Sequence, residues 1–226
     1  MRRPLRALST VLIVAGVLML ADAGLTLVWQ EPLSAVYAKI VQGQLGDDLR
    51  RLETRKPSSL DLAALQKLVT ERRRMAFLAR RLRADAGDRA AVGRIRIPKI
   101  RASFVLVNGT DTAALRKGPG IYDGVPFPGA PGTTAIAGHR TTYLAPFRNI
   151  DRLKRGNQVI VEMPYGRFTY AVEKTLIVAP TRVDVIHRVN YDRLVLSACH
   201  PLYSAAQRIV VFARLVSAQA RGAARR

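Results

Sequence analysis

Hydrophobic positions divide the chain into parts that differ in periodicity. A continuous apolar run from Leu8 to Trp29 comes first, a basic stretch with apolar residues at helical spacing follows, and short alternating stretches separated by Gly and Pro begin at Gly93. The pattern predicts four parts: an apolar N-terminal segment (1–30), a helical basic tether (31–92), a β-rich domain (93–216) and a basic tail (217–226) that we expect to be disordered.

The first part has the length and polarity of a membrane-spanning helix. As a helix, Leu8 to Trp29 would be about 33 Å long, close to the roughly 30 Å of a bilayer's hydrocarbon core. Arginines at positions 2, 3 and 6 precede it, which places the N-terminus in the cytoplasm and the remainder outside. Trp29 lies where an interfacial aromatic anchor is expected. The Ala-Asp-Ala motif around Asp22 resembles a cleavage site, so a cleaved signal peptide is the alternative to a retained anchor.

Residues 31–92 predict helices, with a break at Pro57. Apolar residues recur at helical spacing on both sides of the break: Val36, Ile40, Val41, Leu45, Leu60, Leu62, Leu65, Leu68 and Val69. Ser58 or Ser59 can cap the second helix, which we expect to continue through the arginines at 72–74. A membrane-surface or partner helix would show this pattern. Because charged runs are usually solvated faces, we interpret it as a solvated tether with an apolar stripe docked on the domain.

The third part predicts a small all-β barrel or sandwich, because it holds many short β-branched stretches with turn residues between them. The predicted strands are Arg94–Ile97, Ala102–Asn108, Thr133–Ala137, Gln158–Glu162, Arg167–Ala179, Arg193–Cys199 and Arg208–Val216, with helical turns at Thr112–Leu115 and Pro146–Ile150.

The net charge of +21, from 37 Lys and Arg against 16 Asp and Glu, favours partners that carry negative charge. Anionic lipid, acidic polymer and nucleic acid are all candidates. We assign most of the charge to the juxtamembrane segment and the tail. Aromatic residues do not interleave the basic clusters as they do in a stacking platform, so nucleic acid is not an expected partner.

The candidate chemistry lies at the ends of strands. Cys199 ends one apolar strand, and a turn then leads into a second strand that carries Arg208, so a hairpin would bring the two residues together. Cys199 is the sole cysteine and cannot form an intramolecular disulfide, which leaves a core residue or a nucleophile. His139 directly follows a third apolar strand. An imidazole can activate a thiol and protonate a departing amine, and a guanidinium can stabilise an oxyanion.

Other polar residues near these strands have simpler interpretations. His200 should point away from the side that Cys199 faces, since side chains alternate along a strand. His187 is expected on the surface and Arg140 in solvent. Leu144, Val185 and Ile186 could line a substrate groove, although apolar residues are more often core. The histidines and Cys199 lack the spacing of zinc ligands, so neither a metal nor a cofactor is expected.

Several motifs resemble the sortase family, and within it the class E type of actinobacteria. The likeness extends from Gly93 to Leu215. Its carriers are IPKI (97–100), GPGIY (118–122), PGAPGTTAIAGHRTTYLAPF (128–147), LKRGNQV (153–159) and LVLSACHP (194–201) followed by QRIVV (207–211). The combination of GHRTTY with a later Cys-His-Pro and Arg is specific, whereas an isolated GHR would not be.

This resemblance implies a mainly β fold: a closed eight-stranded sortase-type β-barrel, preceded here by the transmembrane helix and the helical tether. It implies Cys199 as nucleophile, His139 as acid and base, and Arg208 as stabiliser of the oxyanion or substrate. Substrate contacts are expected at Thr141, Thr142, Tyr143 and Ala198. Tyr143 matches the tyrosine associated with LAxTG rather than LPxTG signals, and Ala198 replaces a usual Thr, which bears on substrate preference.

The implied reaction is cleavage of a C-terminal sorting signal between Thr and Gly, followed by transfer of the acyl group to a peptidoglycan-precursor amine. The partners would then be sorting-signal-bearing secreted proteins, the cell-wall precursor and the membrane, with the catalytic domain outside the cell. An exported cysteine peptidase and a cell-wall cross-linking transpeptidase use the same residue types and remain alternatives. The non-enzymatic alternative is a basic, membrane-tethered module that binds an anionic polymer, supported by charge alone.

Overall fold

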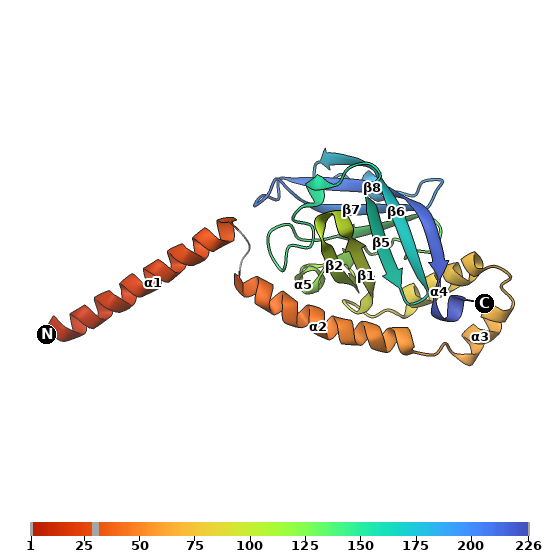
Figure 1. The fold of residues 1–226 in the computed structure, drawn as a ribbon, viewed down its shortest axis with the longest axis horizontal. Coiled ribbons are helices and arrows are strands. Elements are labelled where there is room, and N and C mark those ends of the chain that lie inside the picture. The colour runs from red at the N-terminus through yellow and green to blue at the C-terminus, as the bar shows by residue number, and fades with distance from the viewer. Residues whose placement is uncertain (1, 29–31, 226) are drawn as a thin grey trace.

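The computed structural model describes residues 2–28 and 32–225, so Trp29 lies outside the described residues. Helix α1 (Arg2–Val28) extends away from the rest of the chain (Figure 1). Its segment Arg6–Gly24 has a mean hydropathy of 2.0 and is unburied along its length. By length and composition it can cross a membrane, as the sequence predicts, and a signal sequence would have the same properties.

Eight strands close into a barrel in the order β1-β2-β3-β4-β7-β8-β6-β5. They are β1 (Ala91–Ile97), β2 (Ala102–Asn108), β3 (Gly120–Ile121), β4 (Thr133–Ala137), β5 (Gln158–Met163), β6 (Gly166–Val178), β7 (Arg193–His200) and β8 (Gln207–Ala220). The expected eight-stranded barrel is thereby confirmed. The sequence pattern missed only β3 among these strands, because two residues are too short to show a period.

Short helices lie between the strands and after the last one. They are α5 (Thr112–Lys117) and the 3₁₀ turns η1 (Pro98–Ile100), η2 (Ile150–Arg152), η3 (Val183–Ile186) and η4 (Gly222–Ala224). The helical turn predicted at Thr112–Leu115 is confirmed in α5. The predicted turn at Pro146–Ile150 is also confirmed: the Arg148 N–H donates to the Ala145 carbonyl oxygen (2.9 Å), the Ile150 N–H donates to the Phe147 carbonyl oxygen (3.1 Å), and η2 follows from Ile150.

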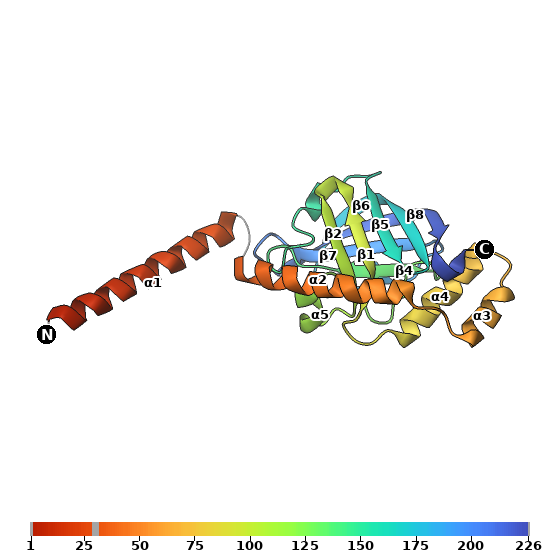
Figure 2. The ribbon, with the colours of Figure 1, turned by 60° about the horizontal axis from the view of Figure 1, so that its bottom comes forward.

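Helix α2 (Pro32–Thr54) runs along the outside of β1 and β2 (Figure 2). Leu45 and Leu49 of α2 form a small apolar cluster with Val105 and Val107 of β2. Gln42 adds polar contacts: its Nε2 donates to the carbonyl oxygens of Val105 (3.2 Å) and Lys117 (2.9 Å), and its Oε1 accepts from the Val105 N–H (2.8 Å). The side-chain amide thus pairs with the β2 backbone as a neighbouring strand would.

Helices α3 (Ser59–Gln66) and α4 (Glu71–Asp85) follow the break at Pro57, and Ser58 caps α3 as predicted. The expected continuation through the arginines at 72–74 is wrong, because α3 ends and Thr70 caps a new helix. The apolar stripe is also mostly wrong: Leu65 is 1% exposed, but Leu60 is 82% exposed.

Helix α4 docks on the barrel through buried Met75 and Ala79 and through the partly buried Arg83. Arg83 donates to Asn108 Oδ1 (2.6 Å) and to the Tyr122 carbonyl oxygen (3.2 Å), and its guanidinium lies 4.9 Å from the centre of the Phe127 ring. Docking on the domain is thus confirmed but through α4, and Arg72 and Arg73 are exposed as predicted, whereas Arg83 is not solvated.

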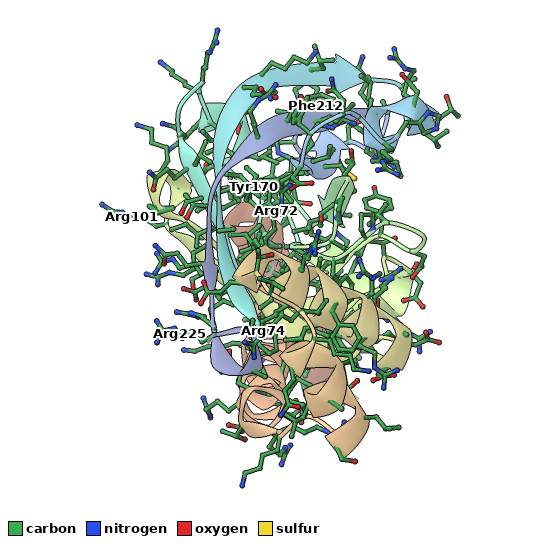
Figure 3. The ribbon with its side chains drawn as sticks, turned by 90° about the vertical axis from the view of Figure 1, so that its right-hand side faces the viewer. Arg72, Arg74, Arg101, Tyr170, Phe212 and Arg225 are labelled. Carbon is green, nitrogen blue, oxygen red and sulfur yellow. The ribbon has the colours of Figure 1, made fainter. Side chains whose placement is uncertain are left out.

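Residues 217–225 are ordered, which corrects the prediction of a disordered tail over the described part of 217–226. Strand β8 continues to Ala220, which pairs with Gly166 of β6, and the η4 turn follows. Arg74 of α4 donates to the Ala223 carbonyl oxygen at 3.0 Å, and Figure 3 shows Arg74 and Arg225 beside this turn. The basic composition of this segment predicted disorder. Instead, β8 pairs with the backbone of the long β6 strand, and Ala224 is buried.

Replacing Gln42 by Ala is expected to lower the free energy of unfolding by about 1–3 kcal/mol, because the buried Val105 N–H and C=O lose their partner. Chemical denaturation of the purified chain measures this loss. Gln44→Ala, on an exposed position of the same helix, is the matched control and should change stability little. Equal stability of the two variants would show that the amide contributes nothing to docking.

Candidate active site

The parallel pairing of β4 with β7 brings His139 level with Cys199. Ala137 pairs with Ser197 at the end of the two strands. The Gly138 N–H donates to the Ser197 carbonyl oxygen at 3.1 Å, so the β4–β7 hydrogen bonding extends one residue past the end of β4. His139 and Cys199 each lie two residues beyond the Ala137–Ser197 pair. Because side chains alternate along a strand and strands lie about 4.8 Å apart, this register directs both residues to the same side of the barrel wall.

The β7–β8 hairpin adds Arg208 to this side. Cys199 and Arg208 are directly paired across the two antiparallel strands, which confirms the predicted hairpin. Cross-strand partners project from the same face of a sheet. The half-buried Arg208 donates from Nη1 to the carbonyl oxygens of Ala205 (2.9 Å) and Gln207 (3.0 Å), so its guanidinium lies against the turn that follows Cys199.

The loop after His139 returns tightly to its starting point. The Phe147 N–H donates to the His139 carbonyl oxygen at 3.0 Å, and the fully buried Phe147 ring lies against Gly138. A Cβ at Gly138 would be 2.7 Å from Phe147 Cδ2, closer than such atoms approach. Glycine before His139 is therefore required by this contact.

Three consecutive residues of this loop adopt the left-handed conformation. Tyr143, Leu144 and Ala145 have φ values of 50°, 63° and 42°, which non-glycine residues rarely adopt. Such strain persists only where surrounding contacts hold it, and it concentrates at functional sites. Among the contacts here, the Ala145 N–H donates to the Thr142 carbonyl oxygen at 2.8 Å.

Tyr143 lies between the histidine and the tether helix. Its ring centre is 5.2 Å from that of His139 and 6.3 Å from that of Tyr37 on α2, the latter in an edge-on arrangement. The Tyr143 N–H donates to Ser34 Oγ of the same helix at 3.2 Å. The first turns of α2 thus form part of the wall beside His139, a contact between segments more than 100 residues apart that no sequence pattern indicated.

Burial lowers the pKa of His139 below its ordinary value, and the positive charge of Arg116 adds to this effect. The neutral imidazole is consequently favoured at neutral pH. Its Nε2 is one of the few buried side-chain polar atoms in the described chain that lack a hydrogen-bond partner. A buried nitrogen without a partner is costly unless it has a role with another molecule or group, and a neutral imidazole nitrogen can accept a proton from a thiol.

Arg140 is not solvated as predicted. It is 4% exposed, and it bonds to the backbone carbonyl of Cys199 and to His200 Nδ1. The sequence could not reveal this, since an arginine after a glycine-flanked histidine is usually exposed. His200 itself makes this structural contact, in agreement with the prediction that it does not share the side of Cys199.

The remaining predicted residues lie around this group. Thr141, Thr142 and Leu144 are half-buried in the loop after His139, and Ala198 is buried and paired with Ile209. Val185 and Ile186 pack partly buried against the main core, and His187 is exposed as predicted. The structure therefore gathers the loop residues near His139 but places Ala198 in the core.

Two further polar residues of the site were missed. Ser197 lies on the face of Cys199, two residues earlier on β7, and its Oγ is 2.9 Å from the hydroxyl of Tyr122. Period-two alternation from Cys199 would have identified Ser197. Tyr122 could not have been found this way, because it lies just beyond the two-residue strand β3.

Replacing Arg116 by Ala is expected to raise the titration midpoint of His139, because one source of positive charge is removed. NMR titration of the ring protons measures the midpoint, which should stay below about 6.5 because burial remains. Lys117→Ala, its neighbour in α5, is the control and should shift it less. An unshifted midpoint in the Arg116 variant would contradict this account.

The folded-state pKa of His139 lies below its unfolded-state value, so protonation of this histidine favours the unfolded chain. The free energy of unfolding should therefore fall as the pH drops below about 6.5.

Comparison with known proteins identifies the family. A family model described as Sortase domain matches residues 95–216, more than half of the chain. Sortase D of Bacillus subtilis (strain 168) is 34% identical over 131 residues, which cover 56% of this chain and 65% of that protein. The chain spans between 28% and 65% of the length of the curated relatives it matches.

Solved structures agree with this match. Sortase E from Streptomyces avermitilis is 30% identical, with a TM-score of 0.54 over 62% of this chain and 99% of that one. A Clostridium perfringens Sortase D5 transpeptidase has a TM-score of 0.63 over 78% of this chain and 99% of that one, at 19% identity, a likeness of fold alone. On the family match and the closed eight-stranded barrel, the chain belongs to the sortase family.

Proposed function

We propose that this chain is a membrane-anchored cysteine transpeptidase. It cleaves a C-terminal LAxTG- or LPxTG-like sorting signal between Thr and Gly, and it joins the new carboxyl end to an amine of a cell-wall precursor. The observation that carries this proposal is the strand register that directs Cys199, His139 and Arg208 to one side of the barrel wall. Membership of the sortase family supports the same reaction class.

In the first step, Cys199 Sγ attacks the Thr carbonyl carbon of the signal. His139 takes the thiol proton as the S–C bond forms, and it returns this proton to the Gly nitrogen as the C–N bond breaks. The neutral imidazole that burial favours is the form that can accept the proton. The products are a thioester on Cys199 and a free amine at the released glycine.

In the second step, an incoming amine attacks the thioester carbonyl. His139 accepts a proton from the amine and transfers it to the departing sulfur, which restores the thiol. Water in place of the amine would give hydrolysis by the same route. The distinction between a transpeptidase and a peptidase therefore depends on which nucleophile reaches the thioester.

Arg208 is the proposed stabiliser of the oxyanion that forms in each step. Its guanidinium presents several donors in a fixed planar arrangement, and fixed donors aimed at an oxyanion typically lower the barrier by about 3–4 kcal/mol. Its pairing with Cys199 puts the charge beside the nucleophile. In this structure Nη1 bonds to carbonyl oxygens of the turn that follows Cys199, and the proposed role has the guanidinium donate from this side to the oxyanion.

Tyr143, with Thr141 and Thr142, is the proposed wall for the sorting signal. Its ring contacts the His139 ring, so a residue of the signal next to the scissile bond would meet it. The small side chain of Ala198 lies in the core beneath this region and would act through packing.

Anchoring is proposed through α1, whose apolar span follows basic residues at positions 2, 3 and 6. By the positive-inside rule, the N-terminus would be cytoplasmic and the barrel extracellular, where secreted proteins and cell-wall precursors meet. The domain limits predicted from sequence, with an anchor to residue 30, a tether to 92 and a catalytic domain from 93, fit this arrangement.

Cys199→Ala is expected to abolish cleavage of an LAxTG peptide, because no other thiol can form the thioester. His139→Ala should reduce cleavage at least 100-fold, in line with the usual contribution of acid–base catalysis. Mass spectrometry of the products, with and without an added amine, also separates transfer from hydrolysis. His187→Ala, an exposed histidine, is the matched control and should retain activity. Cleavage by the Cys199 variant would overturn the assignment.

Tyr143→Leu is expected to reduce the preference for LAxTG over LPxTG peptides, because the ring that would meet the signal beside His139 is lost. The measurement is the ratio of kcat/KM for the two peptides, with an expected change of about 10-fold or more, the scale of one altered apolar contact. An equal loss on both peptides would instead assign Tyr143 to support of the His139 loop.

A further inference from the structure

Arg140 is a buried cation beside the candidate site. It directly follows His139 and is 4% exposed. A guanidinium in such a position is costly unless its donors are paired. Nη2 lies 2.9 Å from the Asp151 carboxylate, which offsets the charge from a half-exposed position in the η2 turn.

The other partners of Arg140 belong to two segments that the chain must hold together. On one side, Nη1 donates to the Cys199 carbonyl oxygen (3.3 Å) and lies 3.2 Å from His200 Nδ1. On the other side, Nε and Nη2 donate to the Arg148 carbonyl oxygen at 3.4 and 3.3 Å. One rigid fork thus connects the end of β7 with both ends of the loop that begins at His139.

The closed loop is the one that contains the left-handed run at residues 143–145. Strained backbone needs contacts that over-determine it, and the bond from Arg140 to the Arg148 carbonyl oxygen closes the loop across this run. The bond to Cys199 is made to its backbone, so the sulfur remains available for chemistry. Arg148 adds a second link in the same direction, from Nη2 to the Tyr203 hydroxyl at 3.2 Å.

We propose that Arg140 is a positioning residue that sets the geometry between Cys199 and His139 by clamping the two segments that carry them. It touches neither substrate nor reacting atoms. This role deepens the proposed function and rests on it. A planar guanidinium with several donors in fixed directions can hold both segments at once, whereas an ammonium group at the same place is a single point of attachment.

The kinetic test replaces Arg140 with Lys and with Ala in the full chain. The Lys variant keeps the charge and most of the volume, and we expect its kcat for peptide cleavage to fall about 10-fold with KM changed less than about twofold. The kcat of the Ala variant should fall about 100-fold, which is the scale of a small misplacement of reacting groups. Arg152→Ala removes an exposed arginine from the same η2 turn and should match the wild type. Thermal unfolding verifies that each variant is folded, and if the Ala variant is not, the Lys variant decides.

A second measurement is independent of any substrate. In the wild type, iodoacetamide should alkylate Cys199, the sole thiol of the chain, and His139→Ala should slow this alkylation, because the neighbouring imidazole accepts the thiol proton. In the Arg140→Lys background the same His139→Ala change should slow alkylation by a smaller factor, since the two groups are held less closely. A folded Lys variant with wild-type kcat and an undiminished effect of His139→Ala on alkylation would overturn the positioning role. Absence of peptide cleavage by the wild type, with the effect of His139→Ala on alkylation intact, would overturn the proposed function alone.

Discussion

The candidate site depends on the parallel pairing of β4 with β7. Parallel neighbours in a sheet end at the same edge, so the residues that follow each strand are placed together without any direct bond between them. Here those residues are His139 and Cys199, and the antiparallel β8 strand adds Arg208 from the other side of β7. A slip of one residue in this register would turn either His139 or Cys199 to the opposite face. The chemistry proposed for these two residues therefore depends on the hydrogen-bond register between β4 and β7.

Arginine side chains extend this constraint to the rest of the molecule. Arg83 attaches α4 to the barrel, Arg74 attaches the same helix to the C-terminal turn, and the buried Arg140 connects the loop after β4 with the end of β7. Each of the three donates to at least one backbone carbonyl oxygen. Part of the large positive charge therefore holds segments of the chain together, which weakens the argument for a polymer-binding module.

The tether belongs to the site as well as to the anchor. Gln42 fixes α2 to the β2 backbone, and from this attachment the helix carries Ser34 and Tyr37 to the Tyr143 loop. The N-terminal turns of α2 therefore lie beside the loop that follows His139. From residue 34 onward, the segment between the proposed membrane anchor and the candidate site is therefore held to the barrel by side-chain contacts.

The sequence by itself determined the strands, the hairpin that pairs Cys199 with Arg208, the apolar N-terminal helix and, through its motifs, the sortase barrel. These are set by period-two patterning, turn residues and runs of apolar residues, which act over short distances along the chain. Only the tertiary structure decided that His139 and Cys199 are level, that Arg140 is buried, that Leu60 is exposed while Leu65 is not, and that the tail is ordered. Each depends on which strand or helix lies opposite, and burial of a single side chain is settled by partners that are distant in sequence.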